Sequence, residues 1–219
     1  MGCLRRFGCL VVVIVLAALA WSNRARILAW VHGVTGTQSP APSAAADWEL
    51  LTPEGADRAK KTIEKLAERS GPVFANVSPG DLVAYVFQEL SKQIPSSAQG
   101  TAAAVVGDQL LVRASMDIND LGGRDLLGPL ASVFNDREPV EFGGTLAVVT
   151  PGIGEYRVSQ LSVRDLSLPH PAIPKLLAKL DRTPRPPGVD DDALALVVPV
   201  HIGDVRIKNG KITLYKVVP

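Results

Sequence analysis

An uncharged run near the N-terminus is the feature of this sequence that most limits how the chain can fold. Arg5 and Arg6 precede residues 7–21, within which residues 10–20 consist only of Leu, Val, Ile and Ala. A charged start followed by such a run is typical of a membrane-targeting segment. At about 1.5 Å per residue the run reaches roughly 22 Å, short of the roughly 30 Å hydrocarbon layer. Its length therefore allows a cleaved signal peptide, and Ala18-Leu19-Ala20 supplies a small-x-small cleavage site.

A retained anchor is the other interpretation of the same segment, and the sequence favours it. Neither Pro nor Gly interrupts the chain between Gly8 and His32, so one helix can continue beyond the apolar run. Trp21 and Trp30 suit the membrane–water interface, where aromatic side chains gather. We therefore expect residues 1–32 to form a single membrane pass, with the N-terminus in the cytoplasm and the main domain extracytoplasmic. Cleavage after Ala20 stays open.

Charge and cysteine content restrict what the rest of the chain can do. Lys and Arg number 23 and Asp and Glu 22, and the charges are scattered rather than clustered. Binding to nucleic acid needs clustered cations, so we expect no nucleic-acid partner. Both cysteines, Cys3 and Cys9, lie in the first ten residues. The exported part must therefore rely on its hydrophobic core rather than on disulfides.

The exported part divides into a linker and one domain. Residues 33–48 are rich in Gly, Ser, Thr, Pro and Ala, a composition that buries little surface, and they predict a flexible tether. Residues 49–219 then predict one domain. Its helices are marked by capping residues and by apolar residues at helical spacing. They are expected over residues 52–69, 78–94, 126–134 and 171–181.

Alternating apolar residues predict a series of antiparallel strands. Asn209-Gly210 between two alternating segments is the strongest of the hairpin signals. Between Tyr156 and Leu168 the apolar spacing alternates between two and three, which predicts bulges that coil the strand. The fold class predicted is α+β: an N-terminal membrane helix followed by a coiled antiparallel β-sheet packed on amphipathic helices. The strands are expected over residues 101–106, 109–118, 142–150, 155–168, 193–200, 201–208 and 211–217.

Catalytic and metal-binding patterns do not stand out from this sequence. The histidines at positions 32, 170 and 201 are too widely spaced for a local metal motif. Three consecutive aspartates at 190–192 could attract calcium, but adjacent residues cannot all converge on one ion. We interpret them as a solvated loop. The sequence therefore predicts a non-enzyme without a catalytic residue, metal or cofactor.

Apolar helix faces are the remaining candidates for a binding site. Such stripes commonly pack into a core. In a domain of coiled strands around amphipathic helices, they could instead line a groove for an acyl chain. The candidate groove residues are Leu82, Val86, Phe87, Leu90, Leu176, Leu177 and Leu180.

The order of these segments resembles that of the YpmS-like family of membrane-anchored extracytoplasmic proteins, whose domain is similar to tubular lipid-binding modules. The matching stretches are Val77-Ser78-Pro79-Gly80-Asp81-Leu82, Tyr156-Arg157-Val158 through Leu161-Ser162-Val163, Asp165-Leu166-Ser167-Leu168-Pro169, and the hairpin at Asn209-Gly210-Lys211. The resemblance implies a membrane-tethered domain that binds a lipid or another long apolar ligand. The alternative is a non-catalytic scaffolding or interaction domain of an envelope complex.

Overall fold

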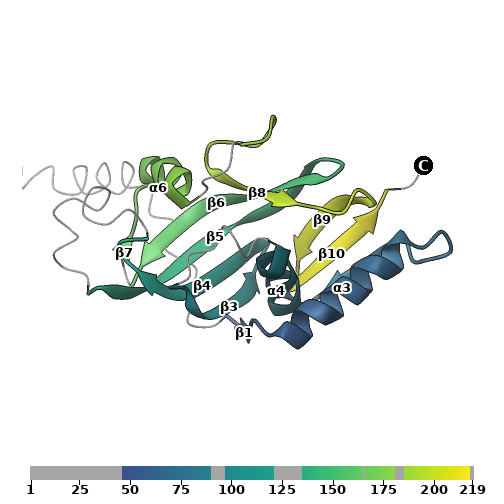
Figure 1. Ribbon diagram of the computed structural model, residues 1–219, viewed down its shortest axis with the longest axis horizontal. Coiled ribbons are helices and arrows are strands. Elements are labelled where there is room, and N and C mark those ends of the chain that lie inside the picture. The colour runs from purple at the N-terminus through teal and green to yellow at the C-terminus, as the bar shows by residue number, and fades with distance from the viewer. Residues whose placement is uncertain (1–45, 90–96, 121–134, 165, 181–184, 218–219) are drawn as a thin grey trace, which may run out of the picture. The chain divides into compact units, whose positions relative to one another are not determined.

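Two antiparallel sheets form the framework of the computed structural model, which describes residues 46–89, 97–120, 135–164, 166–180 and 185–217 (Figure 1). Its strands are β1 (Glu49–Leu50), β2 (Phe74–Val77), β3 (Gln99–Val106), β4 (Gln109–Asp117), β5 (Arg137–Thr150), β6 (Ile153–Val163), β7 (Leu166–Ser167), β8 (Ala193–Val197), β9 (Ile202–Lys208) and β10 (Lys211–Lys216). The larger sheet has the order β1-β3-β4-β5-β6-β7, and β8 pairs with the other end of β6. The smaller sheet has the order β2-β10-β9.

Three α-helices lie against these sheets within the described residues: α3 (Pro53–Ala67), α4 (Pro79–Glu89) and α6 (Ile173–Leu180). A short 3-10 turn, η3 (His170–Ala172), leads into α6. The capping signals act as the sequence predicts, because Thr52 Oγ1 accepts a hydrogen bond of 3.0 Å from the Gly55 amide. Figure 1 shows α3 and α4 beside β9 and β10, and α6 beside β6 toward the other end of the sheet.

The expected α+β class is wrong, because the described fold is mainly β. Strands occupy far more of the described residues than the three short helices do. The long hairpin of β5 and β6 pairs from Val140 with Val163 to Thr150 with Ile153 and forms part of the larger sheet. No helix in the described ranges is long and apolar enough to cross a membrane. The expected anchor over residues 1–32 and the expected helix over residues 126–134 lie outside those ranges.

Strand β6 contains the first of the two predicted bulges, and it ends where the second bulge was expected. Gly143 pairs with Gln160 while Gly144 pairs with Val158, so Ser159 is an extra residue in β6. The bulge therefore accounts for the first spacing of three. The strand does not continue to Leu168 as expected: it stops at Val163, and β7 turns back to pair with it.

A buried carboxylate fixes this reversal of the chain. Arg164 has a positive φ of 55°, which an L-residue adopts at a cost. Its Nε donates to Glu138 at 3.0 Å, and its backbone amide donates to the Pro139 carbonyl at 2.7 Å. Burial by itself raises the pKa of Glu138, but hydrogen bonds from the Asn135 amide and from Arg164 outweigh that effect and lower this pKa. Glu138 is therefore the ionised anchor of the turn.

One hydrophobic cluster joins both sheets and all three helices. Val140, Val158 and Val163 of the larger sheet are fully buried. The Tyr156 hydroxyl, also buried, donates toward the Leu110 carbonyl at 2.9 Å, which satisfies the one polar group of that side chain. The two sheets are therefore parts of a single core rather than two separate bodies.

The C-terminal strands differ from the expected ones at a single junction. Asn209 and Gly210 have φ of 52° and 75°, as a two-residue turn with positive φ at both positions requires, and the predicted hairpin is confirmed. The preceding strands were expected to meet at residues 200 and 201. Instead β8 ends at Val197 and β9 begins at Ile202, which leaves a connection of residues 198–201 between the two sheets.

Candidate functional site

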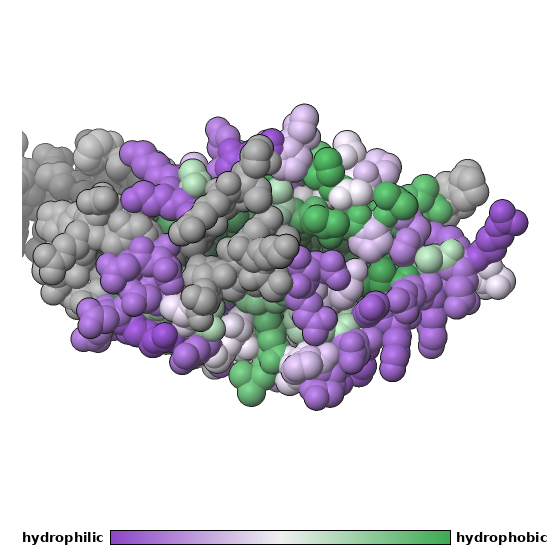
Figure 2. Space-filling view, in the orientation of Figure 1, coloured by the Kyte–Doolittle hydropathy of each residue, from purple (hydrophilic) through white to green (hydrophobic). Residues whose placement is uncertain are grey.

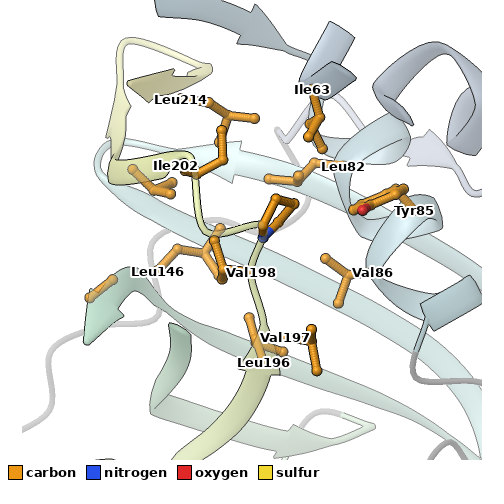
Figure 3. A pocket seen from close by; sticks show the side chains of 13 residues that line it. Ile63, Leu82, Tyr85, Val86, Leu146, Leu196, Val197, Val198, Ile202 and Leu214 are labelled. Atoms are coloured by element: carbon orange, nitrogen blue, oxygen red, sulfur yellow. The ribbon is translucent and has the colours of Figure 1, made fainter. Parts of the chain in front are cut away.

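The β8–β9 connection covers an apolar pocket between the two sheets (Figure 3). Helices α3 and α4 close one side, β5 and β8 the other, and β9 and β10 the end. Every lining side chain is apolar apart from the Tyr85 hydroxyl. The lining residues are Ile63, Leu82, Tyr85, Val86, Leu146, Ala147, Leu196, Val197, Val198, Pro199, Ile202, Val205 and Leu214.

The pocket has a buried floor and an open rim. Ile63, Leu82 and Ile202 form part of the floor and are at most 6% exposed, whereas Val197 at the rim is 68% exposed. The centre of a water-sized sphere can move through about 50 Å³ of the pocket. A single water needs about 10–15 Å³ on the same measure. The pocket is therefore large enough for a short stretch of hydrocarbon, and it lacks the polar partners that would hold ordered water.

Hydrogen bonds at both ends hold the β8–β9 connection over the pocket. The Val198 amide donates to the Gly152 carbonyl at 3.2 Å, in the turn between β5 and β6. The His201 ring nitrogen Nε2 lies 3.0 Å from the Ile63 carbonyl oxygen of α3. His201 thus ties the connection to helix α3.

A close approach at Gly154 sets the position of Val198. A Cβ at residue 154 would lie 2.5 Å from Val198 Cγ2 and 3.1 Å from the Ala147 carbonyl oxygen. Carbon atoms in contact normally stay at least about 3.5 Å apart. Glycine at this position therefore lets the wall of the pocket close against β6.

Tyr85 contributes the polar group of the pocket. Burial raises its pKa above the ordinary value, and the carboxylates of Glu89 and Glu64 raise it further. The phenol is therefore neutral at physiological pH and can both donate and accept a hydrogen bond. In Figure 3 its oxygen lies on the side of the ring that faces the other lining residues. A ligand with one hydrogen-bonding group could be oriented here.

Apolar surface continues outside the pocket over its rim. Val197 and Val200 are each 68% exposed, and both belong to the stretch from β8 to β9. Figure 2 shows hydrophobic surface over this part of the molecule, between β8 and the tips of β5 and β6. Large apolar patches on soluble surfaces commonly mark contact sites. The rim could therefore contact a ligand that extends beyond the pocket.

The candidate residues from the sequence are divided between two places. Leu82 and Val86 of α4 line the pocket, and Phe87 packs against the core without lining it. Leu176 and Leu177 of α6 are fully buried in the core and do not line the pocket. Leu90 and the side chain of Leu180 lie outside the described part of the structure.

The wall formed by β8 and its connection was missed from sequence. The available signal was the run Leu196-Val197-Val198-Pro199-Val200, in which apolar residues occupy consecutive positions rather than alternating ones. Consecutive apolar residues on a strand that has one buried face must leave some of them exposed. On β8 the exposed one is Val197, and Val200, which follows in the connection, is exposed as well.

The three aspartates at 190–192 have separate partners, and two of them form ion pairs with arginines. Asp190 pairs with Arg157, and Asp191 pairs with Arg185. Asp192 lies 4.0 Å from His170, and its carbonyl accepts from the Val158 amide at 2.9 Å. Over the described ranges, no group of three or more His, Cys, Asp or Glu side chains is placed to hold a metal ion.

Comparison with known proteins adds no relative: no protein-family model, no curated protein and no solved structure matches this chain.

Proposed function

We propose that this domain binds an amphiphile with a hydrocarbon chain, such as a fatty acid or a lipid, and that the end of that chain enters the apolar pocket. The observation that supports the proposal is a pocket whose lining is apolar except for one phenol and whose mouth opens onto exposed valines. Pockets of this composition suit apolar ligands, with a few polar groups that fix orientation.

The size of the pocket restricts how such a ligand binds. A space of about 50 Å³ holds only part of a long chain, so the remainder lies along the rim at Val197 and Val200. Each buried methylene stabilises the complex by about 0.8 kcal/mol, so even a few buried carbons give measurable binding.

Photocrosslinking of a fatty acid that carries a diazirine near the end of its chain tests the proposal. The full-length chain would be reconstituted in phosphatidylcholine nanodiscs, irradiated with the probe, and mapped by mass spectrometry. We expect adducts at Val86, Leu196 or Ile202, with a yield that excess oleate reduces. Adducts spread over the surface and insensitive to oleate would refute the proposal.

Neighbouring residues of α4 provide a matched pair of variants. Val86→Trp should fill the pocket and remove the oleate-sensitive adducts. Phe87→Trp enlarges an adjacent, equally half-buried side chain that packs against the core outside the pocket, and it should leave the adducts unchanged. Equal loss in both variants would mean that disturbance of α4, rather than occupation of the pocket, had caused the effect.

Scaffolding within an envelope complex is the second candidate function, and the exposure of Val197 and Val200 favours it. A protein partner would cover this rim. Val200 suits such a contact because it is exposed but does not line the pocket. Chemical crosslinking in native membranes would then return one stoichiometric partner that Val200→Lys abolishes. Fatty-acid adducts at Ile202 would be unaffected by that substitution if the rim served only a protein.

The proposed location is the outer side of a membrane, with residues 1–32 as the targeting segment. The supporting observation is the apolar run over residues 7–21 that follows Arg5 and Arg6. Protease treatment of intact cells and of lysed cells distinguishes the locations. An exported domain is cleaved in both, whereas a domain that is protected until lysis would refute the location.

A further inference from the structure

The smaller sheet has an outer face that combines cations with aromatic rings. Alternation along β9 and β10, together with their register, places Arg206, Lys208, Lys211, Thr213 and Tyr215 on one side. Phe74 of β2 joins them because it is paired with Tyr215. These six residues are called the outer face. Ile212 and Leu214, which alternate with them along β10, are buried in the core on the opposite side.

Positive charge gathers at the hairpin end of the outer face. Lys208 and Lys211 are directly opposite each other across the Asn209-Gly210 turn, and both are exposed. Like charges in directly opposed cross-strand positions destabilise a sheet. The acidic residue on this side is Asp204, which accepts a hydrogen bond of 2.8 Å from Arg206 Nε. The two lysines are therefore left with an excess of positive charge that an external anion would neutralise.

Aromatic and aliphatic groups gather at the opposite end. The rings of Phe74 and Tyr215 are 6.0 Å apart, and the Arg206 guanidinium lies 4.9 Å from the Tyr215 ring centre. Phe74 is 54% exposed. Val73 and Val217, which precede β2 and follow β10, are 55% and 43% exposed at this same end. The sheet thus presents apolar side chains beside cations.

We propose that the outer face docks on an anionic membrane surface, with Lys208 and Lys211 at lipid phosphates and with Phe74 and Tyr215 in the interface. Cations near an anionic leaflet are attracted to it, and aromatic rings settle at headgroup depth. The exposed valines at 73 and 217 favour lipid over nucleic acid, because aliphatic side chains can insert among lipid chains but find no apolar partner along a phosphate backbone. None of the six residues of the outer face lines the apolar pocket.

Hydroxyl-radical footprinting of Phe74 tests the proposal on the full-length protein. The chain would be reconstituted in vesicles of phosphatidylcholine alone and in vesicles that also contain phosphatidylglycerol. Oxidation of Phe74 should fall in the anionic vesicles and recover at high salt, because salt screens the attraction. Leu50 on β1 is 68% exposed and serves as the internal reference, with equal oxidation in both. Equal oxidation of Phe74 in the two compositions would overturn the proposal.

Paired lysine substitutions test whether these cations are responsible. At about 1 kcal/mol per cation, each lysine removed should weaken docking about fivefold, so Lys208→Gln with Lys211→Gln should abolish most of the protection of Phe74. Lys60→Gln with Lys61→Gln removes the same charge from the exposed side of α3 and should leave the protection intact. Protection that survives the first pair of substitutions overturns the proposal. So does protection that a single-stranded oligonucleotide produces without anionic lipid.

Discussion

Gly154→Ala should deform the apolar pocket without changing any residue that lines it. The new Cβ would lie 2.5 Å from Val198 Cγ2, so Val198 must retreat by about 1 Å to restore an ordinary carbon–carbon contact. Two features resist that movement: the Val198 amide donates to the Gly152 carbonyl, and the Ala147 carbonyl oxygen, 3.1 Å away, blocks the other side of the new methyl group. Overpacking of this kind costs about 1–3 kcal/mol.

The two expected effects are lower stability and weaker ligand binding. Urea unfolding of the full-length protein should give a free energy of unfolding lower by about 1–3 kcal/mol. The yield of oleate-sensitive fatty-acid adducts at Ile202 should fall, because Val198 belongs to the pocket wall. Gly143→Ala is the matched control. Its Cβ would lie 3.0 Å from Leu111 Cδ2, a milder crowding away from the pocket, and it should reduce stability by less than Gly154→Ala does, without changing the adducts.

Two results for Gly154→Ala would contradict these expectations, each for a different reason. Unchanged adducts at Ile202 in a destabilised Gly154→Ala protein would mean that the crosslinked ligand does not occupy this pocket. Unchanged stability would mean that the β8–β9 connection can move away freely, in contradiction to its two anchoring hydrogen bonds.

Two further predictions concern the buried carboxylate that fixes the end of β6. Glu138→Gln should lower the free energy of unfolding at neutral pH by about 1–2 kcal/mol, because the hydrogen bonds from Arg164 and Asn135 to a charged carboxylate are lost. The loss is no larger because the Arg164 side chain is 41% exposed, so water partly screens its charge. The pKa of Glu138 is lowered in the folded protein, so its contribution is complete above the ordinary value of 4.5 and disappears as the pH falls through the folded pKa. Urea titrations at several pH values should therefore show the wild-type and Glu138→Gln curves converging in acid, and a constant difference would contradict the assignment. Arg164→Gly should be more stable than Arg164→Ala by about 1 kcal/mol, because both lose the ion pair but only glycine adopts a φ of 55° without cost. Equal thermal unfolding temperatures for the two variants would show that the turn is not strained.

Local chemistry accounts for the elements that could be predicted from sequence. Thr52 accepts from the first turn of α3, and Asn209 and Gly210 adopt the positive φ angles that their turn needs. The bulge at Ser159 was predicted from a spacing of three in place of two. Each of these features depends on residues close together in the chain, so the physical cause is complete within a short segment.

The fold class was wrong because a stretch of alternating residues does not reveal how far its ladder extends. Pairing of β5 continues back to Arg137, before the expected start at residue 142, because β4 offers partners as far as Asp117. Glu138 lies on the same strand face as the buried Val140, and this charged residue is 2% exposed because Arg164 and Asn135 satisfy its carboxylate. Asn135 is three residues from Glu138, but Arg164 is 26 residues away, so a local pattern in the sequence does not reveal the ion pair.

The sequence by itself determined which helix faces are apolar, where turns occur and where β6 is bulged, because these follow from periodicity and from backbone preferences. Only the tertiary structure decided what each apolar face meets. Leu82 of α4 and Leu176 of α6 belong to similar stripes, yet Leu82 borders a pocket open to solvent and Leu176 is sealed in the core. The difference arises because the β8–β9 connection crosses near α4 and leaves space there. The hydrophobic effect is non-directional, so it favours burial of both helix faces without specifying what each face packs against.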